Sequence, residues 1–158
     1  YMEIERKYLI EAAEMPENCL SYPFLQIEQA YLSVDPVVRI RRQDDSFYLT
    51  YKSRGKMARE EYNLPLNAQS YAHLLAKADG LVLTKKRYLI PAKDAGIPAS
   101  PLTIELDVFE GAYQGLVLAE VEFSSKEEAD RFVPPTWFGR EVTFTGEYQN
   151  SVLAMKEI

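Results

Sequence analysis

The chain has 158 residues, of which 47% are hydrophobic and 27% are charged, and its formal net charge is −6. This length and composition predict one soluble globular domain with a sizeable core. The acidic balance argues against a protein that tracks long nucleic acids, because such proteins need a net basic surface. A pocket that holds basic residues is still compatible with the overall charge.

The sequence predicts a protein of the cytoplasm. Cys19 is the single cysteine, so no internal disulfide can form, which suits a reducing compartment. No apolar run approaches the ~20 residues of a membrane span. The chain is charged from Glu3 onward, which argues against a signal peptide. Tyr1 precedes Met2 and is left out, so the single domain is expected to cover 2–158.

Alternating and turn-forming residues predict eight strands. Turn signals such as Asp35-Pro36 and Gly55 separate the first five, and a Pro/Gly/Ala-rich loop over 91–101 lies between later ones. The predicted strands cover 3–10, 26–33, 37–42, 47–53, 58–66, 81–90, 102–109 and 116–123.

Helices are predicted in four places. A short helix or turn is expected over 14–20, and Asn67 is expected to cap a helix over 68–78 that ends at Asp79-Gly80. Ser125 and Glu128 have the spacing of a capping box, which predicts a helix over 126–132. The segment 137–146 is expected to be irregular or a short strand, and Asn150 to cap a final helix from Ser151.

Charged residues recur on one face of most strands. Because side chains alternate between the two faces of a strand, Glu3, Glu5 and Lys7 share a face. In several strands the opposite face is aliphatic. The cations of this pattern are Lys7, Arg39, Arg41, Lys52, Lys85 and Arg87, and the acids are Glu3, Glu5, Glu105, Asp107, Glu120 and Glu122. Arg59 and Glu61 also share one face of their strand, and the alternation places that face on the same side as the charged set; this position within the alternation is called parity below.

The pattern favours an α+β, mainly β fold in which eight antiparallel strands close into a barrel. The charged faces would then line a wet tunnel, while the helices would pack outside against the aliphatic faces. The alternative is an open sheet whose charged face is solvated, as is common in antiparallel sheets. Paired Arg-x-Arg and Glu-x-Glu at fixed parity are less usual on such a solvent face.

A tunnel of this kind suits a polyphosphate. Arginine and lysine match phosphate oxygens, and carboxylates become useful there when a hard cation lies between them and the phosphates. The sequence has no Cys/His cluster, so zinc is not expected. Phosphoryl transfer fits this arrangement, because its catalysis is mostly positioning and charge neutralisation.

The residues resemble a known family. Glu3-Ile-Glu-Arg-Lys7 is similar to the ExExK signature of the CYTH, or triphosphate tunnel metalloenzyme, superfamily. The likeness continues in order through 38–42, 51–55, 59–62, 85–88, 104–107 and 119–122, and 133–139 is similar to the short bacterial inorganic tripolyphosphatases. The segment 147–150 departs from the family, because Glu147 and Gln149 replace residues of a basic Arg/Lys-Tyr-x-Asn pattern, which puts a phosphate contact there in doubt.

The resemblance implies an eight-stranded tunnel, a triphosphate substrate and one or two Mg²⁺ or Mn²⁺ ions. It further implies phosphate binding by Lys7, Arg39, Arg41, Lys52, Lys85 and Arg87, and metal binding by Glu3, Glu5, Glu120 and Glu122 with Asp107 and Glu105. Lys85 is either a general base or one more phosphate clamp.

The favoured activity is metal-dependent hydrolysis of inorganic tripolyphosphate to pyrophosphate and phosphate. The alternatives are a nucleoside or thiamine triphosphatase, a class IV-type adenylate cyclase, a non-catalytic polyphosphate-binding module, and a plain structural β-domain. The expected partner is a small triphosphate. Neither nucleic acid nor a membrane is expected, and a homodimer is left open.

Overall fold

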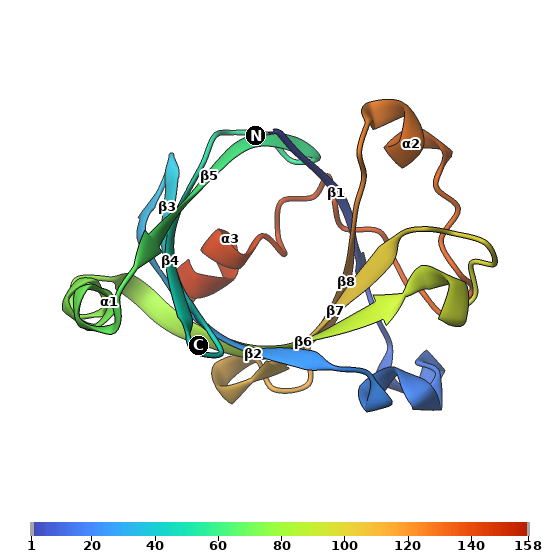
Figure 1. Ribbon diagram of the computed structural model, residues 1–158, viewed down its shortest axis with the longest axis horizontal. Helices are drawn as coiled ribbons and strands as arrows, with labels where there is room; N and C mark the ends of the chain where they lie inside the picture. Colours follow the sequence, from blue (N-terminus) through green and yellow to red (C-terminus); the bar gives the residue numbers. More distant parts are fainter. Residues whose placement is uncertain (1, 158) are drawn as a thin grey trace.

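The computed structural model describes residues 2–157 and forms a single closed ring of strands (Figure 1). Tyr1 and Ile158 lie outside the described residues, so the expected domain limits of 2–158 stay a prediction. The strands are β1 Met2–Leu9, β2 Phe24–Val34, β3 Val37–Gln43, β4 Ser46–Lys52, β5 Ala58–Leu66, β6 Asp79–Pro91, β7 Thr103–Glu110 and β8 Val117–Glu122. The helices are α1 Ala68–Leu75, α2 Lys126–Arg131 and α3 Asn150–Met155, with 3₁₀ turns at Ala12–Glu14, Glu17–Ser21, Ala92–Asp94 and Gly111–Tyr113.

The ring is antiparallel throughout and confirms the predicted closed barrel. Its order is β1-β5-β4-β3-β2-β6-β7-β8, with β8 returning to β1. The register keeps the predicted parity, since Glu5 lies opposite Glu122 and Arg87 lies opposite Asp107. Facing residues of paired strands point to the same side of the sheet, so the charged faces all point into the ring.

Apolar side chains cover much of the outer surface of the barrel. Helix α1 packs Tyr71 against Ala30 and Ile40, and the cap expected at Asn67 is present as a capping box with Ser70. On the side of β1, β7 and β8, Trp137 and Phe138 from the C-terminal segment join a second cluster. Helices α1 and α2 therefore lie outside the ring, as predicted.

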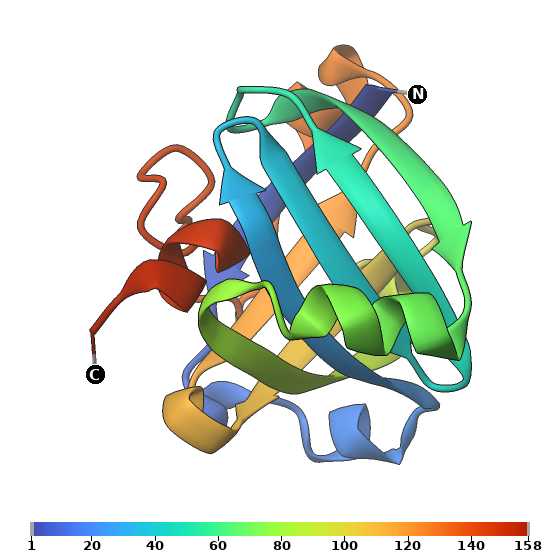
Figure 2. The same cartoon turned by 90° about the vertical axis from the view of Figure 1, so that its left-hand side faces the viewer.

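Helix α3 lies at one end of the barrel instead of along its outer wall (Figures 1 and 2). Its Leu153 and Ala154 are buried against Leu83, Phe109 and Leu118. These three strand residues have the same parity as the charged lumen residues, but they lie nearer this end of the barrel. The charged faces of β6, β7 and β8 thus turn apolar at the end where α3 docks.

Two local predictions differ from the structure. Helix α1 ends at Leu75, and β6 begins at Asp79, which pairs with Tyr31 near the end of β2. The segment 137–146 is irregular apart from an isolated bridge between Glu141 and Tyr8, as expected. Asn150 is the first residue of α3 and not its cap, because its side chain turns into the lumen. Across the described part of the chain, no helix has the length and apolarity needed to cross a membrane.

An arginine outside the ring fastens the C-terminal segment to β1. Arg6 donates to both carboxylate oxygens of Glu141, at 2.8 and 2.7 Å, and to the carbonyl of Ala129 at 2.8 Å. Thr143 also donates to Glu141 at 2.7 Å. A paired and hydrogen-bonded charge in this half-buried place contributes more than a solvated surface pair.

We expect Glu141→Gln to lower the free energy of unfolding by about 2 kcal/mol at neutral pH, because the bidentate pair is lost. The hydrogen bond from Arg6 holds the pKa of Glu141 below its usual range. Its contribution is therefore fully present above the unfolded-state pKa of about 4.3 and is lost as the pH falls through the folded-state pKa. Urea titrations at neutral and acidic pH measure both effects.

The matched control is Asp35→Asn, which breaks an equally short but exposed pair with Arg54 at 2.7 Å. Exposed pairs contribute little, so no measurable loss is expected there. Equal losses from the two variants, or a Glu141→Gln deficit that does not shrink in acid, would contradict the assignment.

Candidate active site

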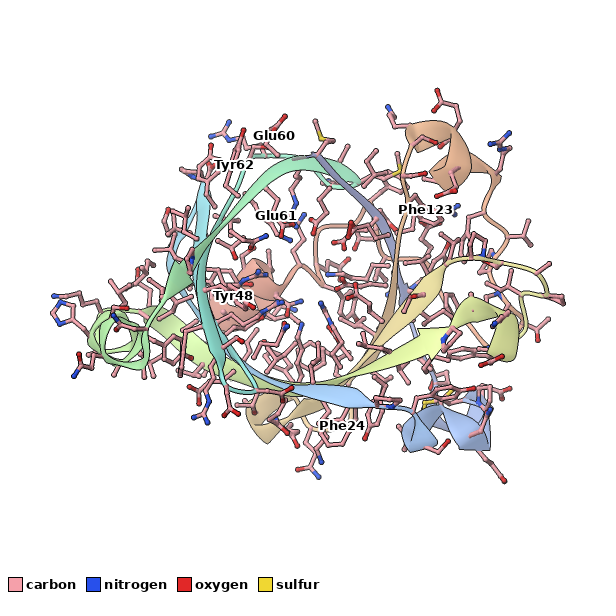
Figure 3. All side chains as sticks on the ribbon, viewed as in Figure 1. Phe24, Tyr48, Glu60, Glu61, Tyr62 and Phe123 are labelled. Carbon is pink, nitrogen blue, oxygen red and sulfur yellow. The ribbon has the colours of Figure 1, made fainter. Side chains whose placement is uncertain are left out.

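The lumen holds a cavity of about 180 Å³. Eleven of the twelve predicted site residues line it, namely Glu3, Glu5, Lys7, Arg39, Arg41, Lys52, Lys85, Arg87, Glu105, Glu120 and Glu122. Asp107 does not line the cavity. Arg59 and Glu61 belong to the lining as their parity indicated, and Figure 3 shows Glu61 pointing into the ring while Glu60 and Tyr62 point away.

Acids and bases lie on opposite walls of the cavity. Most of the carboxylates come from the neighbouring strands β1, β7 and β8, with Glu61 on β5, whereas Arg39, Arg41 and Lys52 come from β3 and β4, on the other side of the ring. Lys7, Lys85 and Arg87 lie among or beside the acids. A ligand in the cavity would therefore meet cations on one wall and mostly carboxylates on the other.

Several lumen cations are already held by carboxylates. Lys52 Nζ lies 2.9 Å from Glu3 Oε1, and Lys7 Nζ lies 3.3 Å from Glu120 Oε1. Burial and the hydrogen bond with Glu61 raise the pKa of Glu3 to about 7. Burial also acts to raise the pKa of Glu120, but three surrounding lysines and arginines hold it well below its usual range.

Asp107 lies beneath the cavity wall as a fully buried counter-ion. Its carboxylate accepts from Arg87 Nε at 2.7 Å and Arg87 Nη2 at 2.9 Å, and Lys85 Nζ is 2.7 Å away. Burial opposes ionisation, yet the two cations lower the pKa of Asp107. Both oxygens are thus committed to Lys85 and Arg87, which makes Asp107 a residue that orients these cations.

Arg39 and Arg41 differ from the other lumen cations. Arg41 donates from Nε and Nη2 to Gln29 Oε1, at 2.9 and 2.6 Å, and Arg39 Nη2 donates to Thr50 Oγ1 at 3.2 Å. Within residues 2–157, neither guanidinium is in an ion pair, and Arg39 Nε has no hydrogen-bond partner. Burial, with Arg39 and Arg87 nearby, lowers the pKa of Arg41 to about 9. This wall of β3 is therefore an uncompensated positive centre.

Lys85 is almost wholly buried in the wall of the cavity. Its Nζ lies 2.7 Å from Asp107 Oδ2 and donates to Asn150 Oδ1 at 2.8 Å. Burial lowers the pKa of Lys85 to about 7, although Asp107 acts in the opposite direction. Asp107 and Asn150 together fix the ammonium at one point of the wall.

The acids on the other wall have the chemistry of a site for a hard cation. All of the candidate donors are carboxylate oxygens, which suits Mg²⁺ or Mn²⁺ and not zinc. Burial and the nearby charges of Glu120 and Glu3 raise the pKa of Glu5 well above its usual range, a repulsion that a divalent cation would relieve. Among the described residues, however, no three His, Cys, Asp or Glu side chains are already grouped as a metal site. Metal binding would therefore require some of the acids to leave their lysine or arginine partners.

Sequence reasoning missed several lining residues. Tyr31 of β2 lines the cavity, and its register opposite Arg39 could have placed it. Gln29 stands on the same face of β2 opposite Arg41, but it is completely buried and contacts Arg41 without lining the cavity. Asn150 carried no such signal, because it enters the lumen from the end of a helix. Gln149 and Ser151 join it at the same end of the cavity.

The comparisons with known proteins agree with this architecture. The CYTH domain model matches residues 2–151. An inorganic triphosphatase of Nitrosomonas europaea is 36% identical over 97% of both chains, and one of Acetivibrio thermocellus is 32% identical over 96% of this chain and 92% of its own. A crystal structure of an inorganic triphosphatase superposes with a TM-score of 0.69 at 33% identity, covering 98% of this chain and 95% of the other.

A closed antiparallel ring around a lumen of facing acids and bases defines the tunnel class of triphosphate-processing domains. The chain belongs to the CYTH domain family, which confirms the expected membership. It is an enzyme of the metal-dependent triphosphatase type that this family contains.

We expect Asp107→Ala to lower the free energy of unfolding by about 3–5 kcal/mol, because it leaves two buried cations without their shared counter-ion. Glu105→Ala is the matched control. It lies two residues away on the same strand, pairs with Arg87 at 3.3 Å and is partly exposed, so a loss of under about 1 kcal/mol is expected. Denaturant unfolding measures both, and a small effect at Asp107 would remove its role as a structural counter-ion.

Proposed function

We propose that this chain hydrolyses inorganic tripolyphosphate to pyrophosphate and phosphate with Mg²⁺ or Mn²⁺. The observation that carries the proposal is the pair of arginines on β3, which face the cavity without a carboxylate partner in the described structure. Guanidinium groups recognise phosphate oxygens by paired hydrogen bonds. The names of the two curated relatives, which align over nearly their whole length, support the triphosphate as substrate.

The phosphate chain is expected to lie between the two walls. Arg39, Arg41 and Lys52 bind it from β3 and β4, and Lys7, Lys85 and Arg87 bind it from the other side. Held between these cations, the terminal phosphate is positioned for attack by water. In this site Glu3, Glu5, Glu105, Glu120 and Glu122 are the residues that would hold metal, and Asp107 is assigned to positioning instead.

A bound divalent cation would neutralise phosphate oxygens and favour an ionised water molecule at neutral pH. The chain itself contributes position and charge. Lys85, fixed at one point of the wall, either accepts the proton of the attacking water or binds a phosphate oxygen. These two roles predict different kinetics and are separated below.

Nucleotide substrates are the main competing proposal. The charged lumen recognises phosphates and does not by itself exclude a nucleoside or thiamine triphosphate, or cyclisation of ATP. The described lining contains Tyr31 and Val37 but no further aromatic or aliphatic side chain, and this favours a substrate without an organic group. A cytoplasmic location, the absence of nucleic-acid and membrane partners, and a homodimer stay predictions.

The decisive experiment is phosphate release from purified protein given tripolyphosphate or ATP, with Mg²⁺, with Mn²⁺ and with a chelator. The proposal expects metal-dependent turnover of tripolyphosphate in clear excess over ATP. Preference for ATP would transfer the assignment to a nucleotide reaction, with ADP or cyclic AMP as the product that tells which. Binding of tripolyphosphate without turnover would make the domain a polyphosphate-binding module.

We expect Glu122→Ala to lower metal-dependent kcat by about 100-fold or more while the thermal unfolding midpoint stays unchanged, because Glu122 lies on the rim of the acidic wall. Glu127→Ala on α2 removes an equally exposed carboxylate far from the lumen and is the control. Normal turnover by the Glu122 variant would remove this residue from the metal-binding set.

We expect Lys85→Ala to lower kcat by about 100-fold with a smaller change in KM if Lys85 acts as the base. A rise in KM at unchanged kcat would instead identify a phosphate clamp. Lys86→Ala is the control, since Lys86 follows directly in β6 but points to the outer face and pairs with Glu110 at 3.8 Å. Steady-state kinetics with tripolyphosphate separate the two readings.

A further inference from the structure

Two amides, the buried Gln29 and the half-buried Asn150, connect the wall of arginines with Lys85. Asn150 Oδ1 accepts from Lys85 Nζ at 2.8 Å and from Gln29 Nε2 at 2.7 Å. Gln29 Oε1 accepts from Arg41 Nε and Nη2 at 2.9 and 2.6 Å. The four side chains form one continuous hydrogen-bond relay, Arg41–Gln29–Asn150–Lys85, across four elements of the fold, β3, β2, α3 and β6.

The chemistry of the two ends fixes the direction of every bond in the relay. An arginine and a charged lysine can only donate hydrogen bonds. Gln29 must therefore turn its oxygen toward Arg41, which leaves its NH₂ group to face Asn150. Asn150 must turn its oxygen toward Lys85, and that same oxygen receives the Gln29 donor. No other orientation of either amide satisfies both neighbours.

Burial makes the relay rigid. Gln29 is completely buried and Lys85 is 1% exposed, so water has little access to replace a broken bond. A buried polar group that loses its partner costs free energy, so each amide is held where both of its neighbours are satisfied. The position of Lys85 Nζ is thereby set by Asn150 on one side and by Asp107 on the other.

Asn150 ties the relay to the helix that covers one end of the barrel. It is the first residue of α3, whose Leu153 and Ala154 are buried against the apolar end of the lumen. The hydroxyl of Tyr113 donates to the carbonyl of Leu153 and anchors the other end of the helix. The docking of α3 thus places the Asn150 Oδ1 atom within hydrogen-bond distance of Lys85 Nζ.

We propose that Gln29 and Asn150 are positioning residues that hold Lys85 and Arg41 in place for the triphosphate, an inference that rests on the proposed function. Neither amide supplies charge or a proton to the reaction. They act by fixing two cations at a set separation, one on β3 and one on β6, the two strands that flank β2. Their loss should therefore change turnover more than it changes folding.

The first test compares three variants: two change Asn150 at the start of α3, and one changes Tyr113 at the other end of the helix. Asn150→Leu removes the acceptor and should lower kcat by about 10-fold or more, with KM changed by less than about 3-fold. Asn150→Asp keeps an oxygen for both donors and should keep Lys85 Nζ in its wild-type position, while its added negative charge beside the phosphates should raise KM. Tyr113→Phe loosens the other end of α3 without touching the relay and should leave kcat unchanged. Equal losses in the Leu and Phe variants would show that only helix docking matters and would overturn the proposal.

The second test asks whether the two amides act as one unit. Gln29→Met has a similar length but neither donor nor acceptor, and it should lower kcat as Asn150→Leu does while also raising KM through Arg41. The double variant should lose no more kcat than the worse single variant, because either change already breaks the relay. If the loss of kcat in the double variant equals the product of the two single losses, the amides act independently and the proposal is overturned.

A structural measurement separates this inference from the proposed function. Crystal structures of Asn150→Leu and Tyr113→Phe should show Lys85 Nζ displaced in the first and unmoved in the second. An unmoved Nζ in Asn150→Leu overturns the positioning role whatever the enzyme hydrolyses. A displaced Nζ in a protein whose wild type turns over no triphosphate would uphold the relay and reject the proposed function.

Discussion

The structure depends on compensating charge inside a closed barrel. Seven cations and six carboxylates line the cavity, and Asp107 beneath it brings the acids to seven, although the whole chain carries a net charge of −6. Burying many unpaired charges would cost more than the fold can supply, so ring closure requires that most of them face one another. Arg39 and Arg41 are the exceptions, and neutral side chains hydrogen-bond both of them. The strand order meets this requirement by placing the acidic strands β1, β7 and β8 across from β3 and β4.

Strands β6, β7 and β8 also carry the apolar end of the barrel. Leu83, Phe109 and Leu118 continue the lumen faces of Lys85, Asp107 and Glu120 by one further pleat, and α3 buries them. A lumen that was charged along its full length would give a helix nothing to dock on. The switch from charged to apolar residues within each strand fixes where the cavity ends and brings Asn150 to Lys85.

Strand parity made the barrel and eleven of the lining residues predictable from sequence, because alternation decides which face a side chain occupies. Parity alone could not tell that Asp107 lies behind the wall, since Asp107 and Glu105 share a face and differ only in depth along the strand. It also could not place Asn150, which reaches the lumen from a helix whose docking depends on tertiary contacts. The expected cap at Asn150 was wrong for this reason, because its side chain bonds Lys85 and Gln29 and not its own helix.

The paired state of most lumen cations affects which solutes can compete for the cavity. At Lys52 and Lys7 a simple anion such as sulfate or chloride must displace Glu3 or Glu120, and the displaced carboxylate is then left buried and repelled. Arg39 and Arg41 are bonded only to neutral side chains among the described residues and set no such cost. The ion pairs thus make the wall of β3 the part of the cavity where an anion can bind without breaking an existing pair.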